Sequence, residues 1–416
     1  MKSLIKTSIL LIIAINTAFP QVSLPQAQKN EFLNDLVSSF ENEFLWEEKG
    51  KQIAEKLSSK IKNGDYSNIN DAEMFVEILN RDLYLLSNDL HLTVDLYNPN
   101  PDSGNSKKEG PSKKTSFIFT EVLDNSICYL KFDSFPRLTK DIEKEIDDVM
   151  SSLVNASTVI IDLRDNSGGS DETVNHILGY FFKEKKKLAT SYQWNASPKD
   201  IWTTPKILSK KLSDVKLIVL TSQSTFSGAE IFTQRLQSHQ RAIVIGEKTP
   251  GAAHRTATYL MSDIFLLNWP YEESKHAKDG QNIEAIGIVP DYLAHYNKAK
   301  EIALNFAKKG KVKATKKIIS SKESKLVKAL VEALNSASDS EYQSFIATHV
   351  MSDHQDRVSR TLSKHKTVWN ENHNGKIINI HQLPENNLRL FIETSFGIRQ
   401  MKIVLNNNKI KKVMTR

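Results

Sequence analysis

The chain has 416 residues, of which 39% are hydrophobic and 25% are charged. This composition excludes a disordered or fibrous protein, and the length favours two or three units over a single small core. The formal net charge of +7 is concentrated in residues 297–328, where 11 lysines and two glutamates give 11 − 2 = +9. The rest of the chain is therefore close to neutral, which argues against a nucleic-acid-binding face.

The first residues have the pattern of a signal peptide. Lys2 and Lys6 precede a short apolar run, residues 9–15, so we expect residues 1–20 to direct export to the periplasm or the extracellular space. This run is far shorter than the roughly 20 residues that a membrane-spanning helix needs, so we expect no membrane span. The only cysteine, Cys128, cannot form an internal disulfide, and its apolar neighbours predict a core position in a strand.

Residues 25–95 are predicted to form a helical N-terminal region. Between residues 29 and 88, apolar side chains recur at spacings of three and four, which is typical of amphipathic helices. A strand-like run follows at residues 92–96. The next segment, residues 98–114, is rich in Pro, Gly, Ser and Lys, which predicts an exposed loop.

Residues 115–310 alternate between strand-like and helical patterns, which predicts an α/β fold with a mostly parallel sheet. The expected strands are 117–122, 127–132, 159–163, 216–220 and 242–245, and the expected helices are 140–153, 171–182 and 227–239. Eight of the 15 glycines lie between Gly168 and Gly287, more than an even spread would place there. Because glycines gather where the backbone turns sharply or approaches a ligand, we expect the chemistry in this segment.

The C-terminal part has a different character. Residues 311–335 are expected to form a lysine-rich linker or helix, and residues 336–416 a small α+β domain, for which we suspect a cystatin-like shape. The expected helices are 325–334 and 341–350, and the expected antiparallel strands are 376–380, 388–393, 401–405 and 410–414, with a hairpin turn at 406–408. His349, Asp353 and His354 lie close in sequence but lack further ligands, which favours surface polar residues over a metal site.

The motif Thr225-Phe-Ser-Gly-Ala-Glu230 follows an apolar strand and opens a helix. Ser227 would therefore lie where helix N–H groups converge, and that environment suits the oxyanion of acyl transfer. Gly228 would allow the backbone to approach a reacting group closely. The pair Ser227 and Glu230 also fits a capping box, and the motif by itself favours that structural role.

Three further segments supply the other groups that such a serine needs. The turn that ends in Gly168-Gly169 could present backbone N–H groups to an anion, or could be an ordinary strand–turn–helix joint. A hydroxyl nucleophile also requires a base, for which His91 is a candidate, and an acid to orient the base, for which Glu284 is a candidate. Each residue alone is more often structural than catalytic. Their combination favours an active site.

Together these segments resemble the C-terminal-processing-peptidase superfamily of serine peptidases, in particular the branch of interphotoreceptor retinoid-binding protein and the tricorn protease core. The similarity runs from about residue 31 to about residue 309. Five motifs match in the order of the family: D-x-H-L at Asp89–Leu92, D-L-R-x-N-x-G-G at Asp162–Gly169, T-F-S-x-A-E at Thr225–Glu230, G-E-x-T-x-G-x-x-H at Gly246–His254 and E-x-x-G-x-x-P-D at Glu284–Asp291. The resemblance implies a crotonase-like (ClpP/crotonase) ββα spiral core.

The resemblance also implies roles for individual residues. Ser227 would be the nucleophile, His91 the general base and Glu284 the residue that orients the base. The implied oxyanion hole consists of Gly228 together with Gly168 or Gly169. The substrate would be a peptide or a protein, and neither a metal nor an organic cofactor is required. The oligomeric state is not indicated.

The sequence departs from the family at three places. The processing-peptidase branch uses a lysine base 25 residues after the serine, where this chain has Ala252, and the nearest lysine, Lys248, lies in a turn. This departure favours the histidine and glutamate version of the site. Leu90 stands where tricorn-like enzymes have a serine before the histidine. Only about 25 residues separate His91 from the first core strand, too few for a PDZ domain.

Three alternatives remain beside a secreted serine peptidase. A binding protein for a lipophilic ligand or a peptide could use the same fold, although the complete Ser/His/Glu set argues against a pure binder. Acyl-CoA chemistry occurs on the related crotonase fold, but a signal peptide would separate the protein from coenzyme A. Finally, the C-terminal domain could carry the function, with the hydrolase core as a scaffold.

Overall fold

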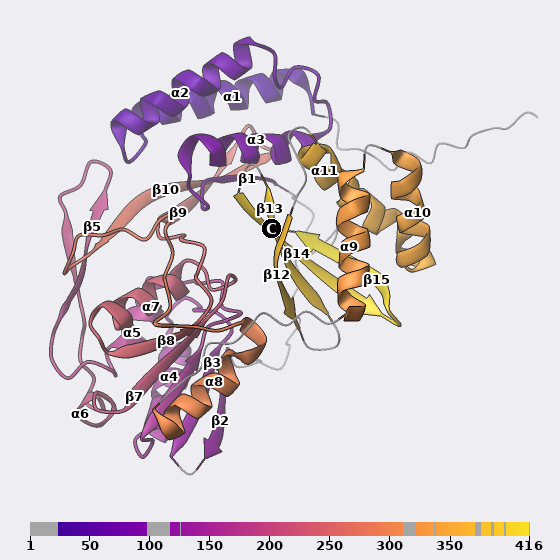
Figure 1. Cartoon of the computed structure of the whole chain (residues 1–416). Helices are drawn as coiled ribbons and strands as arrows, with labels where there is room; N and C mark the ends of the chain where they lie inside the picture. The colour runs from indigo at the N-terminus through magenta and orange to yellow at the C-terminus, as the bar shows by residue number, and fades with distance from the viewer. Residues whose placement is uncertain are drawn as a thin grey trace, which may run out of the picture.

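The computed structural model describes residues 24–97, 117–124, 126–310, 321–336, 338–370, 376–383, 387–394 and 397–415. These residues form a mixed α/β protein with a helical N-terminal region, as expected, and three sheets, of which two were expected (Figure 1). The predicted signal peptide, the predicted loop at 98–114 and the start of the lysine-rich segment lie outside the described residues. Among the residues that are described, none of the helices is both long and apolar enough to cross a bilayer.

The N-terminal region consists of three helices and a short strand: α1 (Gln26–Asn42), α2 (Glu47–Lys62), α3 (Ala72–Ser87) and β1 (Thr93–Leu96). The Asp71 side chain caps α3 by accepting a hydrogen bond from the N–H of Met74. At the other end of α3, Asn88 adopts a left-handed conformation with φ of 52°, which an asparagine tolerates better than most residues. This turn directs the chain from the helix into the segment that carries His91.

The central sheet has six strands in the order β11-β8-β7-β4-β3-β2. Its strands are β2 (Ile118–Asp124), β3 (Ile127–Phe132), β4 (Thr158–Asp162), β7 (Lys216–Thr221), β8 (Ala242–Gly246) and β11 (Tyr292–Leu293). Only the β2–β3 pair is antiparallel, so the predicted mostly parallel sheet is confirmed. Cys128 lies in β3, as predicted, and is partly buried.

Helices cover both faces of this sheet. On one face lie α4 (Lys140–Ser152), α5 (Asp171–Leu178) and α7 (Gly228–Ser238), and on the other lies α8 (Tyr296–Lys309). Successive residues of a buried strand face opposite layers: Val159 packs with the first group of helices and Ile160 packs with α8. α5 ends at Leu178, four residues before its predicted end. The loop that follows begins at Gly179, whose carbonyl accepts a hydrogen bond from the backbone N–H of Lys206.

A second sheet was not predicted, apart from its strand at residues 93–96. It contains β1, β5 (Lys187–Gln193), β6 (Lys199–Trp202), β9 (Arg255–Met261) and the long strand β10 (Phe265–His276). Charged residues such as Glu272 and Glu273 are buried in β10 and hide its apolar alternation. Phe265 and Trp269 pack with the N-terminal helices, so β10 joins that region to the rest of the molecule.

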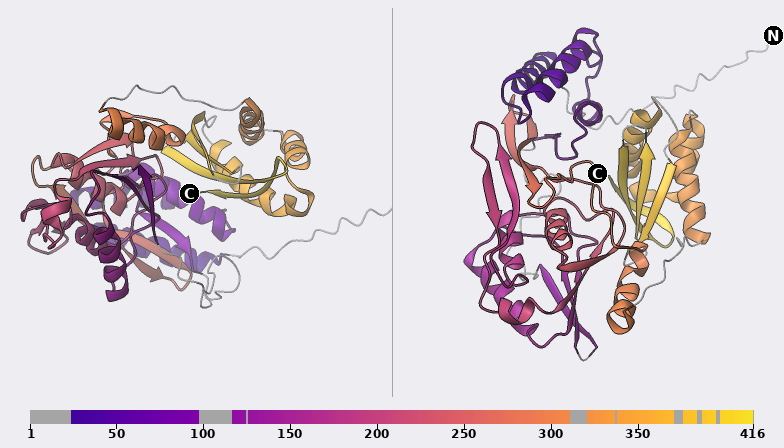
Figure 2. Two further views of the ribbon diagram at one scale, coloured as in Figure 1. Left: turned by 90° about the horizontal axis from the view of Figure 1, so that it is seen from below. Right: turned by 60° about the vertical axis from the view of Figure 1, so that its left-hand side comes forward.

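The C-terminal part combines three helices with an antiparallel meander. Its elements are α9 (Ser321–Asn335), α10 (Asp339–His349), the unpredicted α11 (Gln355–Asn370), β12 (Lys376–Gln382), β13 (Leu388–Thr394), β14 (Gly397–Asn406) and β15 (Lys409–Thr415). The predicted hairpin turn is confirmed, because Asn407 and Asn408 both have positive φ between β14 and β15. Two views show α9 and α10 on the outer side of this sheet, away from the central sheets (Figure 2).

Candidate active site

Ser227 lies where the loop after β7 enters α7. Its φ of 53° and ψ of −122° are unusual for a residue with a side chain, and such strained backbone is concentrated at functional sites. The N–H of Ser227 donates a hydrogen bond of 3.1 Å to the carboxylate of Glu230, which is one part of the predicted capping box. The backbone N–H of Ser227 is therefore bonded to the Glu230 carboxylate, while the Ser227 hydroxyl contacts another residue.

That residue is His91. Its Nε2 lies 3.0 Å from Oγ of Ser227, although the two residues are 136 positions apart. The His91 ring also packs beside Phe226, with 5.0 Å between ring centroids. The carboxylate of Asp89 accepts a hydrogen bond of 2.8 Å from the backbone N–H of His91, which fixes the turn that carries the ring. The structure thus brings the two predicted residues together at hydrogen-bonding distance.

Glu284 joins the same cluster by a different route. Its carboxylate accepts hydrogen bonds from the backbone N–H groups of Ala253 at 2.5 Å, His254 at 3.1 Å and Leu90 at 3.4 Å. It also lies 3.5 Å from Nδ1 of His254. These contacts connect Glu284 to the backbone next to His91 and to a second histidine.

His254 has no predicted role, although it ends one of the five motifs. Its Nδ1 lies 2.7 Å from the carboxylate of Asp89, and both side chains are almost fully buried. Its ring also packs against Trp46, which lies just before α2, with 4.5 Å between ring centroids. A histidine that ends a glycine-containing motif downstream of Ser227 was the signal that could have identified it. Through Asp89, His254 supports the turn that holds His91.

The charges in this cluster are coupled. Burial and the charge of Asp89 raise the pKa of Glu284 to about 7. Burial acts against the charge of Asp89, but the hydrogen bond from His254, the charges of His254 and His91 and the N–H of His91 together outweigh it and lower the pKa of Asp89. Burial likewise acts against a charged His254, yet its hydrogen bond with Asp89 and the charge of Glu284 raise the pKa of His254. Asp89 and His254 therefore form an ion pair, with Glu284 titrating near neutral pH.

Asp89, His254 and Glu284 offer ligand atoms that all lie within 4.8 Å of one another, which is compact enough for a metal ion. Their hydrogen bonds already satisfy the arrangement, because Nδ1 of His254 is paired with Asp89 and the Glu284 carboxylate accepts backbone N–H groups. These hydrogen bonds by themselves explain why the three side chains lie so close together.

The three predicted oxyanion-hole glycines lie against Ser227. A Cβ at Gly168 would come within 2.8 Å of the Ser227 Cβ and 2.7 Å of the Gly228 nitrogen, so only glycine fits there. A Cβ at Gly228 would lie 2.9 Å from the carbonyl oxygen of Gly169. The N–H of Gly168 already donates a hydrogen bond of 2.7 Å to the side chain of Asn166. The two loops are thus in direct backbone contact.

Ala252 occupies the position of the lysine base in the processing-peptidase branch. It is completely buried, and its N–H donates to the carboxylate of Glu230 at 2.9 Å. Lys248 is exposed at the surface. Glu230 itself is completely buried, and burial raises its pKa to about 7. Ala252 therefore contributes a backbone hydrogen bond to Glu230 and a methyl side chain, where the processing-peptidase branch has the amine of a lysine.

Comparison with known proteins agrees with the five motifs. Residues 126–294 match the family model described as Peptidase family S41, and residues 17–126 match the N-terminal domain of Peptidase_S41 in eukaryotic IRBP. A probable CtpA-like serine protease of Staphylococcus haemolyticus is 29% identical over 194 residues, which are 44% of this chain and 38% of that protein. Its namesake in Staphylococcus epidermidis is 31% identical over 135 residues, 32% of this chain and 26% of that protein.

These matches span well under half of the length of either relative. Among solved structures, a lipoprotein from Streptococcus agalactiae aligns with a TM-score of 0.45 and 15% identity, covering 69% of this chain and 98% of that one. Neither matched family model extends beyond residue 294, so the C-terminal helices and sheet lie outside both.

Proposed function

We propose that the protein cleaves peptide bonds through an acyl-enzyme. The chain belongs to the S41 family of serine peptidases, which is part of the C-terminal-processing-peptidase superfamily. The observation that carries this proposal is the 3.0 Å contact between Nε2 of His91 and Oγ of Ser227, at a strained position where α7 begins. A serine that was only a helix cap would not need a histidine at hydrogen-bonding distance from its hydroxyl.

In the proposed first step, Oγ of Ser227 attacks the carbonyl carbon of the scissile peptide while His91 accepts the hydroxyl proton. The carbonyl oxygen becomes an oxyanion, and His91 then passes the proton to the amine that leaves as the C–N bond breaks. Water, activated by the same histidine, hydrolyses the remaining ester. Ser227 and His91 thereby return to their starting protonation states.

The oxyanion would accept hydrogen bonds from the N–H groups of Gly228 and Gly169. We assign Gly169 as the second donor, because the N–H of Gly168 is already directed at Asn166. The N-terminus of α7 adds the positive end of its dipole to the same place.

Glu284 completes the proposed catalytic set. Its negative charge would stabilise the imidazolium that forms on His91, and its hydrogen bond to Leu90 N–H would hold the backbone next to the base. Asp89 acts on the same turn, through the N–H of His91. The carboxylates of Asp89 and Glu284, which both contact His254, would thus favour transfer of the Ser227 proton to His91.

We also propose the finer features that the motifs imply. The segment 115–310 would form a crotonase-like spiral core between the helical region 25–95 and a C-terminal domain, 336–416, that follows a linker at 311–335. The signal-like residues 1–20 favour export, and the substrate would be a peptide or a protein. The mostly parallel sheet flanked on both faces by helices supports this proposal.

A fluorophosphonate probe, which reacts covalently with activated serines, tests the proposed function. We expect labelling of the wild-type protein and none of Ser227→Ala, with a loss of about 10³-fold or more in His91→Ala. Circular dichroism would verify that each variant is folded. If the folded wild-type protein is not labelled, the peptidase proposal fails and the binding-protein alternative takes its place.

A further inference from the structure

The β12 strand carries two buried polar side chains, Asn379 and His381. They alternate with Ile380, so they share one face of the sheet while Ile380 packs in the hydrophobic core on the other face. The strand is irregular at this point, because its register with β13 shifts between Ile377 and Asn379. A buried amide and a buried imidazole destabilise a fold unless they are hydrogen-bonded, so their partners matter.

Both side chains reach the same carboxylate, that of Glu247, which follows β8. Nδ2 of Asn379 donates to Oε1 at 2.8 Å, and Nε2 of His381 donates to Oε2 at 2.6 Å. The same carboxylate accepts the backbone N–H of Gln223 at 3.3 Å and that of Tyr296 at 3.0 Å. Glu247 therefore connects the C-terminal sheet with the loop before Ser227 and with the start of α8.

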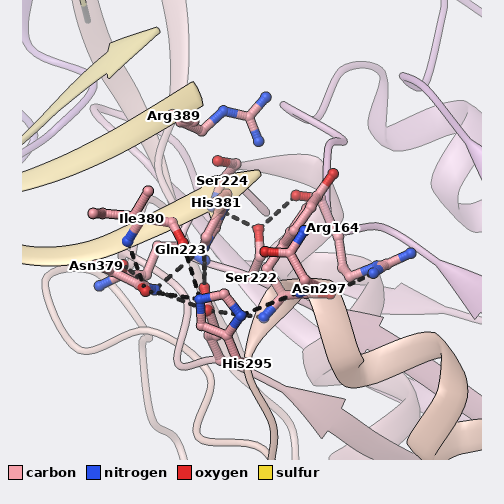
Figure 3. Close-up of polar contacts among 12 residues, drawn as sticks. Arg164, Ser222, Gln223, Ser224, His295, Asn297, Asn379, Ile380, His381 and Arg389 are labelled. Carbon is pink, nitrogen blue, oxygen red and sulfur yellow. Dashed lines mark hydrogen bonds and ion pairs between the residues drawn. The ribbon is translucent and has the colours of Figure 1, made fainter. Parts of the chain in front are cut away.

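The loop before Ser227, residues 222–226, is held from both sides. On one side Asn379 donates a second hydrogen bond, of 3.0 Å, to the side-chain oxygen of Gln223 (Figure 3). On the other side the hydroxyl of Ser222 donates to the carbonyl of Arg164, and the N–H of Phe226 donates to the carbonyl of Asn166. This loop is thus placed between β12 and the turn that leads to Gly168 and Gly169.

A second set of contacts reaches that turn directly. The guanidinium of Arg389, on β13, donates to the carboxylate of Asp165 at 2.9 Å, and the hydroxyl of Tyr296 donates to the same group at 2.9 Å. The ring of His381 stacks on that of Tyr296, with 4.3 Å between centroids and 11° between planes. Asp165 is three positions before Gly168, so β12 and β13 contact both loops that line the nucleophile.

The charge states make this link stable at neutral pH. Burial acts against ionisation of Glu247, but the hydrogen bonds from His381 and Asn379 outweigh it and hold the pKa of Glu247 at about 2. Burial lowers the pKa of His381, so its imidazole is neutral and Nε2–H serves as a donor to a carboxylate.

We propose that Asn379 and His381 are positioning residues for Ser227, which hold Glu247 against the nucleophile loop and so make the C-terminal sheet part of the active-site scaffold. This inference rests on the proposed peptidase function. It gives the C-terminal part, which both matched family models leave out, a role in catalysis through geometry rather than through contact with substrate. Displacements of about 1 Å at a nucleophile can reduce a rate by about 10²-fold, so such a scaffold has a measurable effect.

Variants of His381 in the full-length protein test the proposal. His381→Phe keeps the ring but removes the Nε2–H donor, and we expect Ser227 to be labelled by the fluorophosphonate about tenfold or more slowly. With a peptide substrate, kcat should fall while KM stays within about twofold. His381→Gln places an amide N–H near the same point, and it should recover most of the labelling rate.

Ile392→Val is the matched control, because Ile392 is completely buried in β13 but belongs to the apolar cluster. It should lower Tm without slowing the labelling. A second readout, hydrogen exchange of the backbone amides of residues 222–226, does not depend on catalysis. These amides should exchange about tenfold faster in His381→Phe and at the wild-type rate in Ile392→Val.

Unchanged labelling and exchange in His381→Phe would overturn the proposal, as would equal effects in Ile392→Val at matched Tm. If His381→Phe does not fold, Asn379→Ala takes its place with the same readouts and the same expected results. An unlabelled wild-type protein would refute the peptidase function alone. In that case the exchange measurement would still decide whether β12 holds the loop.

Discussion

Nε2 of His91 lies 3.0 Å from Oγ of Ser227, and this contact joins the end of the N-terminal helices to the first turn of α7. The two residues lie next to strands of different sheets, because His91 precedes β1 and Ser227 follows β7. Anything that moves the N-terminal region relative to the central sheet therefore changes the geometry of the candidate active site.

Replacing Gly168 by alanine should damage the site. The new Cβ would lie within 2.8 Å of the Ser227 Cβ at a residue whose φ is 97°, so both the space and the backbone conformation oppose it. We expect fluorophosphonate labelling to fall by about 10²-fold or more. Gly280→Ala is the control, because φ there is also positive, at 69°, but no atom lies within 4 Å of the new Cβ. Equal labelling of the two variants would contradict this prediction.

Removing the charge of Asp89 should destabilise the protein and weaken the base. Asp89→Asn keeps an oxygen for the N–H of His91 but breaks the buried ion pair with His254. Breaking such a pair costs about 3–5 kcal/mol of unfolding free energy, which urea unfolding can measure. Asp95→Asn is the control, because Asp95 is exposed. The prediction is wrong if both variants unfold at the same urea concentration.

The unfolding free energy should fall as pH is lowered from about 4.5 to about 2, partly because of Glu247. Its pKa is about 2 in the folded protein and 4.5 when exposed, so the unfolded state binds the proton first in this window. A shift of this size corresponds to roughly 3 kcal/mol of stability that is present above the window and lost within it. Glu247→Gln should show a shallower acid slope in urea titrations at several pH values. An unchanged slope would rule out this contribution.

Glu284 should act in the opposite direction. Its pKa is raised from 4.5 to about 7, so the folded state binds the proton more tightly and stability falls as pH rises through this interval. We expect Glu284→Gln to remove part of that decrease between about pH 5 and pH 7. Thermal unfolding of both proteins across this range provides the measurement. A wild-type slope that persists in the variant would show that other groups cause it.

Most of the central sheet could be predicted because its signals are local. Strands such as β4 and β7 contain short apolar runs, and the glycine-rich segments mark where the backbone turns tightly. Ser227 and His91 were found in the same way, from short motifs that each combine a strand or helix end with a reactive side chain. The five motifs then gave the family, which the matches to residues 17–126 and 126–294 bear out.

β10 could not be predicted, because its polarity has a tertiary explanation. Glu273 is buried in the strand because Trp46, 227 positions away, and Asn282, in the segment after the strand, donate hydrogen bonds to it. The residues of the strand itself do not reveal these partners, so its buried charges look like those of an exposed loop. The same reason hid His254, whose position depends on Asp89.

The sequence by itself indicated the candidate side chains, the glycines around Ser227 and the strands that lead into these segments, because each of these signals depends on residues that are neighbours in the chain. Only the tertiary structure decided which groups meet. It directed the N–H of Gly168 to Asn166, linked Glu284 to the backbone beside His91, and joined Asn379 and His381 to Glu247 more than 130 positions away. Buried hydrogen bonds and ion pairs between distant segments depend on the exclusion of water, and burial is a property of the whole fold.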